Sequence, residues 1–280
     1  MTNLIVTPEA LTSAGSISYW RLSGATNLEA LTAAWQREGL DEALLPTPPG
    51  EAVALGRAVH QEESKRWLVR PLARRNAWAL VGETASENSV AYDTMLTVKF
   101  VAGTPVFSRD SISPTDYEVI IARIRANYDR QQGELAPTDI STWLVKLAGQ
   151  SQSVPLRDTG GIYFVPRTAV GFWRRAVKVV ESVSGHRVFQ IPALKNSEAI
   201  DAITDAITQE VDSIMTLMET EFQRTGDEAL GSRAIETRRT ECSELLAKVT
   251  AYDALLGVQL KCRERVENLQ AMIAMAALAA

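Results

Sequence analysis

Residue types that carry chemistry are scarce in this chain of 280 residues, and they do not stand at catalytic or metal-binding spacings. The two histidines, His60 and His186, have no arrangement of cysteines or carboxylates at ligand spacing around them. A zinc site needs about four ligands at recognisable spacing, so we expect no such site and no cofactor. A serine nucleophile on a strand-to-helix turn would show as Gly-x-Ser-x-Gly, and that pattern does not occur.

Carboxylate pairs and cysteines are present, but each has a structural explanation. Asp201 and Asp205 stand four residues apart, which is typical of the solvated face of a helix. Cys242 and Cys262 lie in a segment predicted to be one helix, in which 20 residues span about 30 Å, so they are not expected to pair. We therefore predict that the protein is not an enzyme. The alternative is an enzyme of unknown class whose pocket only coordinates could show.

Two adjacent glycines, Gly160 and Gly161, raise the question of a phosphate-binding loop. Such loops place their glycines after a strand and at the start of a helix. Here the glycines come before a short apolar run that ends at Pro166, so the order predicts a turn, a buried strand and a proline stop. An amphipathic helix is predicted next, over residues 168–182. Beyond about Lys195 the pattern is helical throughout.

Basic residues with aromatic neighbours are the second candidate chemistry. The candidate nucleic-acid-binding residues are Arg66, Arg70, Arg74 and Arg75, near Trp67 and Trp78, and Arg167, Arg174, Arg175 and Lys178, around Trp173. Arginine beside aromatic rings suits a phosphate backbone and unstacked bases. The alternative is that these side chains extend into solvent or pair with an acidic C-terminal segment. The formal charge of −5 lacks the basic balance of a dedicated nucleic-acid binder.

The elements that must position these residues form an α+β body over residues 1–194. Residues 66–109 alternate with a period of two and contain turn residues at three places, which predicts four strands of an antiparallel meander. Further strands are predicted at residues 16–22 and 188–191. Helices are predicted after the caps Asn27 and Ser113, over residues 50–65, from about residue 138 and over residues 168–182. The fold class is therefore a mainly antiparallel sheet with flanking helices.

Residues 195–280 are predicted to form a long antiparallel helical hairpin that resembles a coiled coil. The turn is expected at Gly226 and Asp227. The first helix has about 30 residues and the second about 50, or about 45 Å against 75 Å. The surplus apolar stripe must pack back on the body or meet another chain. The candidate protein-interface residues are Leu256, Leu260, Val266, Leu269 and Ile273.

Charge and composition restrict the partners and the setting. The hairpin holds 15 Asp and Glu against 9 Lys and Arg, whereas residues 1–194 hold 19 against 20. We expect a non-enzymatic assembly protein that forms homo-oligomers or docks a partner through its C-terminal helices, with nucleic-acid binding by the arginines as the alternative. Two cysteines and no basic leader predict a reduced, cytoplasmic setting. No apolar run reaches membrane-spanning length, so no membrane partner is expected.

Three runs together resemble a known family. They are SYWRLSG at residues 18–24, ALGRAV at residues 54–59 and LRDTGGIYFVP at residues 156–166. In this order they are similar to a domain-of-unknown-function family carried by phages, plasmids and other mobile elements of bacteria and archaea, over most of residues 16–280. The resemblance implies a phage or mobile-element setting. It implies no activity and no catalytic residues.

Overall fold

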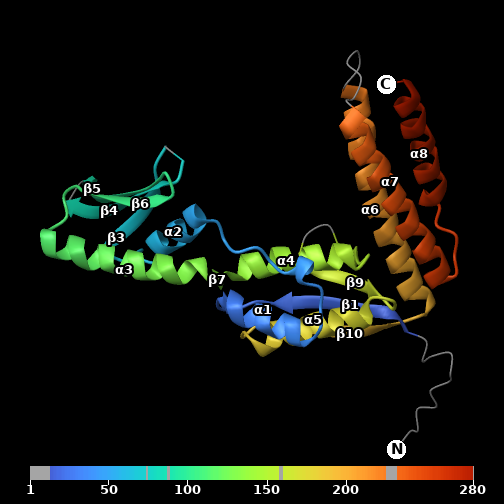
Figure 1. Cartoon of the computed structure of the whole chain (residues 1–280), viewed down its shortest axis with the longest axis horizontal. Coiled ribbons are helices and arrows are strands. Elements are labelled where there is room, and N and C mark those ends of the chain that lie inside the picture. Colours follow the sequence, from blue (N-terminus) through green and yellow to red (C-terminus); the bar gives the residue numbers. More distant parts are fainter. Residues whose placement is uncertain (1–12, 74, 87–88, 158–159, 225–231, 280) are drawn as a thin grey trace, which may run out of the picture. The chain divides into compact units, whose positions relative to one another are not determined.

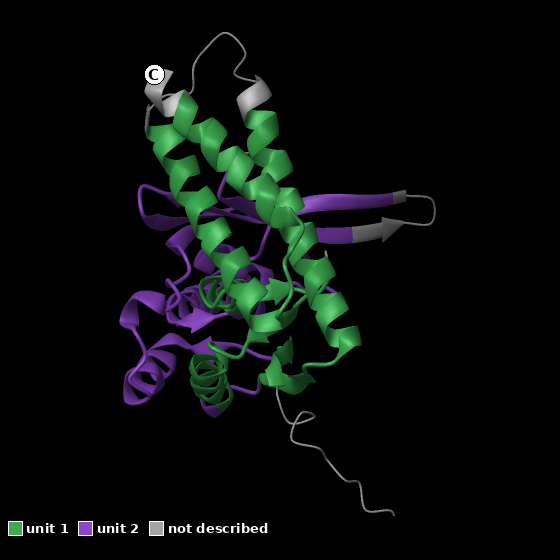
Figure 2. Cartoon of the chain, turned by 90° about the vertical axis from the view of Figure 1, so that its right-hand side faces the viewer, with its two compact units in different colours: residues 1–22, 141–181, 186–280 green, residues 23–140, 182–185 purple. Residues whose placement is uncertain are grey.

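A computed structural model describes residues 13–73, 75–86, 89–157, 160–224 and 232–279. The chain divides into two compact units (Figure 2). Unit 1 comprises residues 1–22, 141–181 and 186–280, and unit 2 comprises residues 23–140 and 182–185. The predicted α+β class is confirmed, with antiparallel sheets, flanking helices and a helical C-terminal region. The boundary predicted between residues 194 and 195 falls inside unit 1 and stays a prediction.

Unit 1 contains a four-stranded antiparallel sheet in the order β10-β1-β9-β8. The strands are β1 (Ser13–Arg21), β8 (Val154–Pro155), β9 (Ile162–Pro166) and β10 (Arg187–Leu194). Gly15 lies opposite Pro166, where β1 pairs with β9, and a Cβ there would stand 2.1 Å from the carbonyl oxygen of Val165. Only glycine allows this close approach of the two strands.

Helices cover both faces of this sheet. On one face, Trp173 of α5 (Val170–Ser182) donates its indole N–H to the Ser18 hydroxyl at 2.9 Å. On the same face, Trp20 donates to the hydroxyl of Ser141, in the part of α4 (Pro137–Gln150) that belongs to unit 1. On the other face, Phe164 packs against Tyr252 of the C-terminal helices, with ring centroids 6.0 Å apart. The C-terminal helices and the sheet therefore share one core.

Strand β10 lies at one edge of the sheet, and this edge is protected against pairing with a further strand. The carbonyls of Phe189 and Ile191 accept hydrogen bonds from two β1 serines at 3.2 and 3.3 Å, so the backbone groups of these residues point toward β1. The backbone groups of the intervening residues of β10 point away from the sheet. There, the Val188 N–H donates to the carboxylate of Glu181 at 2.9 Å, and Pro192 has no N–H. A further strand would therefore find few donors along this edge.

Unit 2 contains the predicted meander, in the order β3-β4-β5-β6. Its strands are β3 (Trp67–Pro71), β4 (Ala77–Ser86), β5 (Ser89–Val101) and β6 (Thr104–Arg109). The packed helices α2 (Glu51–His60) and α3 (Pro114–Gln132) share a core with this sheet. The alternating pattern of β5 places Leu96, Val98 and Tyr92 on one face; Leu96 and Val98 are buried, whereas Tyr92 is 57 % exposed. The register shifts opposite Leu80 and Val81, which interrupts the alternation.

Short elements complete unit 2. They are β2 (Thr26–Asn27), α1 (Leu28–Arg37), the 3₁₀ turn η2 (Glu42–Leu44) and β7 (Glu134–Leu135), which pairs with β2. Both predicted helix caps are confirmed. The side chain of Asn27 accepts the Ala30 N–H at 2.8 Å, and the side chain of Ser113 accepts the Asp116 N–H at 3.2 Å.

The C-terminal segment forms three helices instead of the two predicted. They are α6 (Ser197–Arg224), α7 (Ser232–Leu256) and α8 (Cys262–Ala279), which pack as a bundle (Figure 1). The prediction of one continuous helix beyond residue 228 is wrong. Gly257 has φ +73° and its N–H donates to the carbonyl of Asp253 at 2.9 Å, while the Asp253 carboxylate accepts the Leu260 N–H at 2.7 Å. The chain therefore turns back here. The turn expected at Gly226 and Asp227 lies outside the described residues.

This return explains where the surplus apolar stripe goes. The five candidate interface residues, Leu256, Leu260, Val266, Leu269 and Ile273, are 0–2 % exposed. They belong to the core that the three helices share with the sheet, so they offer no free surface unless the bundle opens. Cys242 and Cys262 lie on separate helices, both buried and both free thiols, instead of on one helix. No helix in the described parts of the chain is long and apolar enough to cross a membrane.

Candidate partner-binding groove

A groove with a volume of about 1250 Å³ lies between α6 and α7. Each helix contributes one stripe of side chains, spaced three or four residues apart and therefore on one face. The stripes are Glu210, Ile214, Leu217 and Glu221 on α6, and Arg238, Glu241, Leu245 and Lys248 on α7. Residues 149, 150 and 152, at and after the end of α4, also line it.

Ion pairs cross the groove at both ends. At one end, the Lys248 ammonium lies 2.8 Å from the Glu210 carboxylate and donates to the carbonyl of Ser153 at 3.0 Å. At the other end, the Arg238 guanidinium lies 2.6 Å from Glu221 and 2.5 Å from Glu241. The 11 residues from Glu210 to Glu221 span about 16 Å of helix, so about three turns separate the two ends.

The floor between the ion pairs is apolar. Met218 and Leu245 are 3 % and 6 % exposed, and Ile214 is half-buried. Leu217 is 72 % exposed, more than any other large apolar side chain that the structure describes. A leucine beside a buried apolar floor gains hydrophobic free energy when a partner covers it.

The rim of the groove is acidic. Four carboxylates line it, those of Glu210, Glu221, Glu241 and Glu244, against the two cations Arg238 and Lys248. A hydrogen bond from Arg238 lowers the pKa of Glu221, and hydrogen bonds to Glu221 and Glu241 raise the pKa of Arg238. Glu221 and Arg238 therefore stay charged at neutral pH. With four carboxylates and two cations, the lining residues carry a formal net charge of −2.

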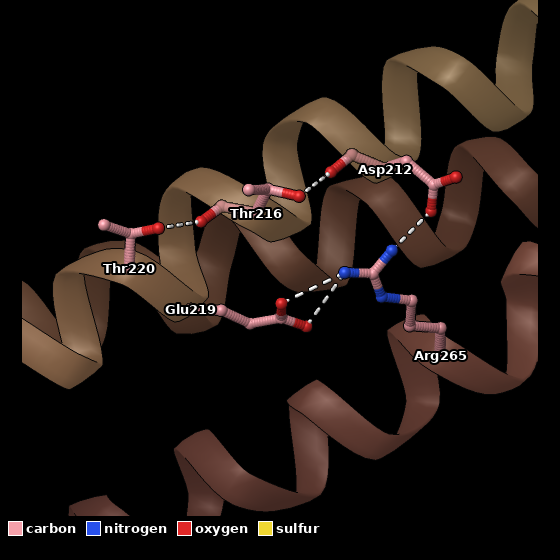
Figure 3. Close-up of polar contacts among 5 residues, drawn as sticks. All are labelled: Asp212, Thr216, Glu219, Thr220 and Arg265. Atoms are coloured by element: carbon pink, nitrogen blue, oxygen red, sulfur yellow. Dashed lines mark hydrogen bonds and ion pairs between the residues drawn. The ribbon is translucent and has the colours of Figure 1, made fainter.

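On the side of α6 away from the groove, an arginine of α8 bridges two acids. Figure 3 shows Arg265 between these acids, 2.6 Å from Asp212 and 3.0 Å from Glu219. The hydroxyls of Thr216 and of Thr220, which lines the groove, donate to the carbonyls four residues earlier, at 2.7 Å each. Helix α7 packs against α8 along more of its length than against α6. The groove lies on the α6–α7 side of the bundle.

The first group of candidate arginines lies in unit 2. Arg66 pairs with Asp116 at 3.0 Å, and its guanidinium stands 4.5 Å from the ring centroid of Trp67. Arg70 and Arg75 are exposed, and Arg74 lies outside the described residues. Arg66 is therefore engaged within unit 2, by a partner outside the acidic C-terminal segment that the alternative interpretation named.

The second group lies in unit 1. Arg174, Arg175 and Lys178 are exposed on α5, and Arg167 is exposed just before it. No acidic residue stands between residues 160 and 180. The two groups belong to different units.

The groove was not predicted from the sequence. The apolar stripe of α6 includes Ile214 and Met218, and Leu217 stands directly beside it. Four of the five residues from 214 to 218 are apolar, which widens the apolar face of the helix beyond what one neighbour covers. That widening is the one sequence feature from which the groove could have been suspected.

The structure offers little catalytic chemistry in its described residues. There, no group of three or more His, Cys, Asp and Glu side chains could hold a metal ion. A smaller pocket of about 480 Å³ in unit 2 contains Glu62 and Arg123. The buried Glu62 carboxylate is paired with Arg123 at 2.5 Å, so its charge is already balanced. Burial raises the pKa of both cysteine thiols, which disfavours nucleophilic thiolate.

Comparison with known proteins gives a family and no activity. Residues 15–280 match a family of unknown function, DUF6744. No curated protein and no solved structure matches the chain.

Proposed function

We propose that this chain, which belongs to the DUF6744 family of unknown function, is a non-enzymatic interaction protein that docks a partner helix in the groove between α6 and α7. The observation that carries the proposal is the groove's composition, an apolar floor with the 72 % exposed Leu217 at its edge. Helix-in-groove recognition uses apolar anchors spaced three, four and seven residues apart, and the groove is long enough for such anchors.

The free energy available from this surface is modest but useful. Covering Leu217 would remove most of a leucine side chain from water, which contributes about 1–2 kcal/mol. Two or three partner anchors on the floor would each contribute a similar amount. Association also costs several kcal/mol in lost freedom, so we expect weak binding, with a dissociation constant of about 1 mM.

The setting is part of the same proposal. The two free, buried thiols are compatible with a reducing compartment, so we place the protein in the cytoplasm. The likeness of its three sequence runs to mobile-element proteins supports a phage or mobile-element origin. The other form of assembly is self-association through the C-terminal helices. A measurement of the oligomeric state of the full chain tests it.

The test uses a neutral amphipathic peptide of alanine and glutamine with leucines at spacings of four, three and four. Its binding to the full chain is measured by fluorescence anisotropy. We expect Leu217→Gln to weaken binding at least tenfold. Asp201→Asn, on the same helix but on the opposite face, should leave the binding of this neutral peptide unchanged. Absence of binding to the unaltered chain, or equal loss in both variants, would reject the proposal.

A second candidate function is nucleic-acid binding, favoured by the basic exposed side of α5. Phosphate contacts by Arg174 and Lys178 would give affinity that falls steeply with salt. The measurement is binding of a labelled oligonucleotide between 50 and 200 mM salt, conditions over which phosphate contacts lose affinity. Charge reversal at both positions should weaken binding. Salt-independent or absent binding would remove this candidate.

A further inference from the structure

We infer that the helix recognised by the groove is basic, with Lys or Arg on the side of its apolar stripe that faces α7. This inference rests on the proposed function and names the class of its partner. The argument comes from the placement of charge around the groove, from the ion pairs that bound it and from the poor fit of a second copy of the chain.

The carboxylates on the rim exceed the cations, and the excess is accessible. Arg238 is shared by Glu221 and Glu241, whose side chains are 38 % and 42 % exposed. Glu244 is exposed one turn further along α7. An incoming helix therefore meets the exposed carboxylates of Glu241 and Glu244 on the α7 side, next to the apolar floor. Lysine or arginine flanking its anchors would complement them.

The ion pairs set the register of the partner. Lys248 and Arg238 already neutralise part of each end, and about 16 Å of groove lies between the pairs. Anchors at positions i, i+4 and i+7 span about 10 Å and fit between them. Basic residues of the partner then lie beyond or beside the anchors, at the carboxylates that Lys248 and Arg238 do not saturate.

A second copy of this chain is a poor occupant on the same grounds. Residues 195–280 carry 15 acidic and 9 basic residues, so two bundles facing each other repel. The basic helix α5 cannot act as the ligand, because its apolar face, including Trp173 at 0 % exposure, is packed on the sheet. The outer edge of β10 is also protected against pairing. A basic helix from another protein would cover the apolar floor and also pair with the carboxylates of the rim.

The experiment compares three peptides with the same leucine stripe and with lysine, glutamine or glutamate on the flanking positions. Their binding to the full chain is measured at low and at high salt. Exposed charge pairs are weak, so two new pairs should tighten the lysine peptide over the glutamine peptide by about two- to thirtyfold. The glutamate peptide should bind weakest, and added salt should reduce the differences.

Two charge reversals on α7 provide a matched comparison. Glu244→Lys lies at the groove, whereas Glu236→Lys changes the net charge equally but lies outside it. We expect Glu244→Lys to remove most of the preference for the lysine peptide and Glu236→Lys to retain it. Loss in both variants would mean that only the overall charge attracts the peptide, which would overturn the inference.

The outcomes separate the two proposals. If the glutamine peptide binds and the lysine peptide binds no tighter, the inference fails and helix docking stands. If none of the three peptides binds, both fail. If light scattering shows a dimer that Leu217→Gln dissociates, the occupant is a second copy of the chain and the inference is overturned.

Discussion

Replacing Gly257 by alanine tests why the third helix turns back. At φ +73° the residue is in the left-handed region, where a residue with a Cβ costs about 1–2 kcal/mol. Space is not the constraint, because the atom nearest to an added Cβ is the flexible Lys195 ammonium nitrogen at 3.7 Å. We therefore expect Gly257→Ala to lower the free energy of unfolding by about 1–2 kcal/mol.

The competing outcome is a single long helix formed by fusion of α7 and α8. That state would expose Leu260, Val266, Leu269 and Ile273, which are 0–2 % exposed in the bundle. Burial of each such side chain contributes about 1.5–3 kcal/mol, so the four contribute about 6–12 kcal/mol as an upper estimate. The strain at one residue is several times smaller. The turn should therefore survive the substitution.

Urea unfolding followed by circular dichroism gives the stability, and size exclusion with light scattering gives the mass. Gly171→Ala is the matched control, since Gly171 lies in α5 with no heavy atom within 4 Å of an added Cβ and without a positive φ. It should be neutral or stabilising. A Gly257→Ala chain that loses no stability, or that doubles in mass, would refute the reasoning.

Three further predictions concern buried polar groups. Burial alone would raise the pKa of Asp139, but hydrogen bonds from Arg57 and a backbone N–H lower it overall. A lowered pKa contributes stability that is present at neutral pH and lost as the pH falls through the folded value, so thermal melts of Asp139→Asn should show a deficit at pH 7 that disappears below about pH 4. Tyr252→Phe removes a 2.8 Å hydrogen bond to the Gln152 carbonyl and should cost about 0.5–1.5 kcal/mol in urea unfolding, with retention of full stability as the contrary result. Both cysteines are buried with a raised pKa, so a thiol reagent should label the native chain slowly and two sites per chain in urea; fast native labelling would contradict their burial.

Local patterns were sufficient to predict much of the fold. The meander followed from alternating residues and turn residues, and the helix starts followed from Asn27 and Ser113, because caps act within a few residues of the chain. The alternation failed at Tyr92 for a non-local reason. Residues 90–94 of β5 are exposed on both faces, because no described helix of the unit 2 core packs on this end of the strand, and the pattern of one strand does not contain that information.

The break at Gly257 could not be predicted from periodicity. One glycine inside a helix costs only about 1 kcal/mol relative to alanine, so an apolar pattern that continues past it favours a continuous helix. The decision comes from tertiary packing. The Asp253 carboxylate accepts the Leu260 N–H, seven residues away, and Arg265 of α8 bridges two acids of α6. The contacts of Arg265 join residues about 50 positions apart, so they are not visible in a local pattern.

The groove was missed for a related reason. Its existence depends on how far α6 stands from α7, and its charge depends on which carboxylates share Arg238. Both are properties of the packed bundle. The sequence contains only the hint of Leu217 beside the stripe, and a single apolar residue of this kind is common on helix surfaces.

The most direct test of the central claim is to locate a bound helix by photo-crosslinking. p-Benzoylphenylalanine is placed at Thr220, which lines the groove, or at Asp201, which is exposed on the same helix nine residues before Glu210 and therefore on the opposite face. The lysine peptide is then added and the chains are irradiated. We predict a covalent adduct from position 220 and none from position 201. Equal adducts from both positions, or an adduct from position 201 alone, would contradict helix docking in the groove.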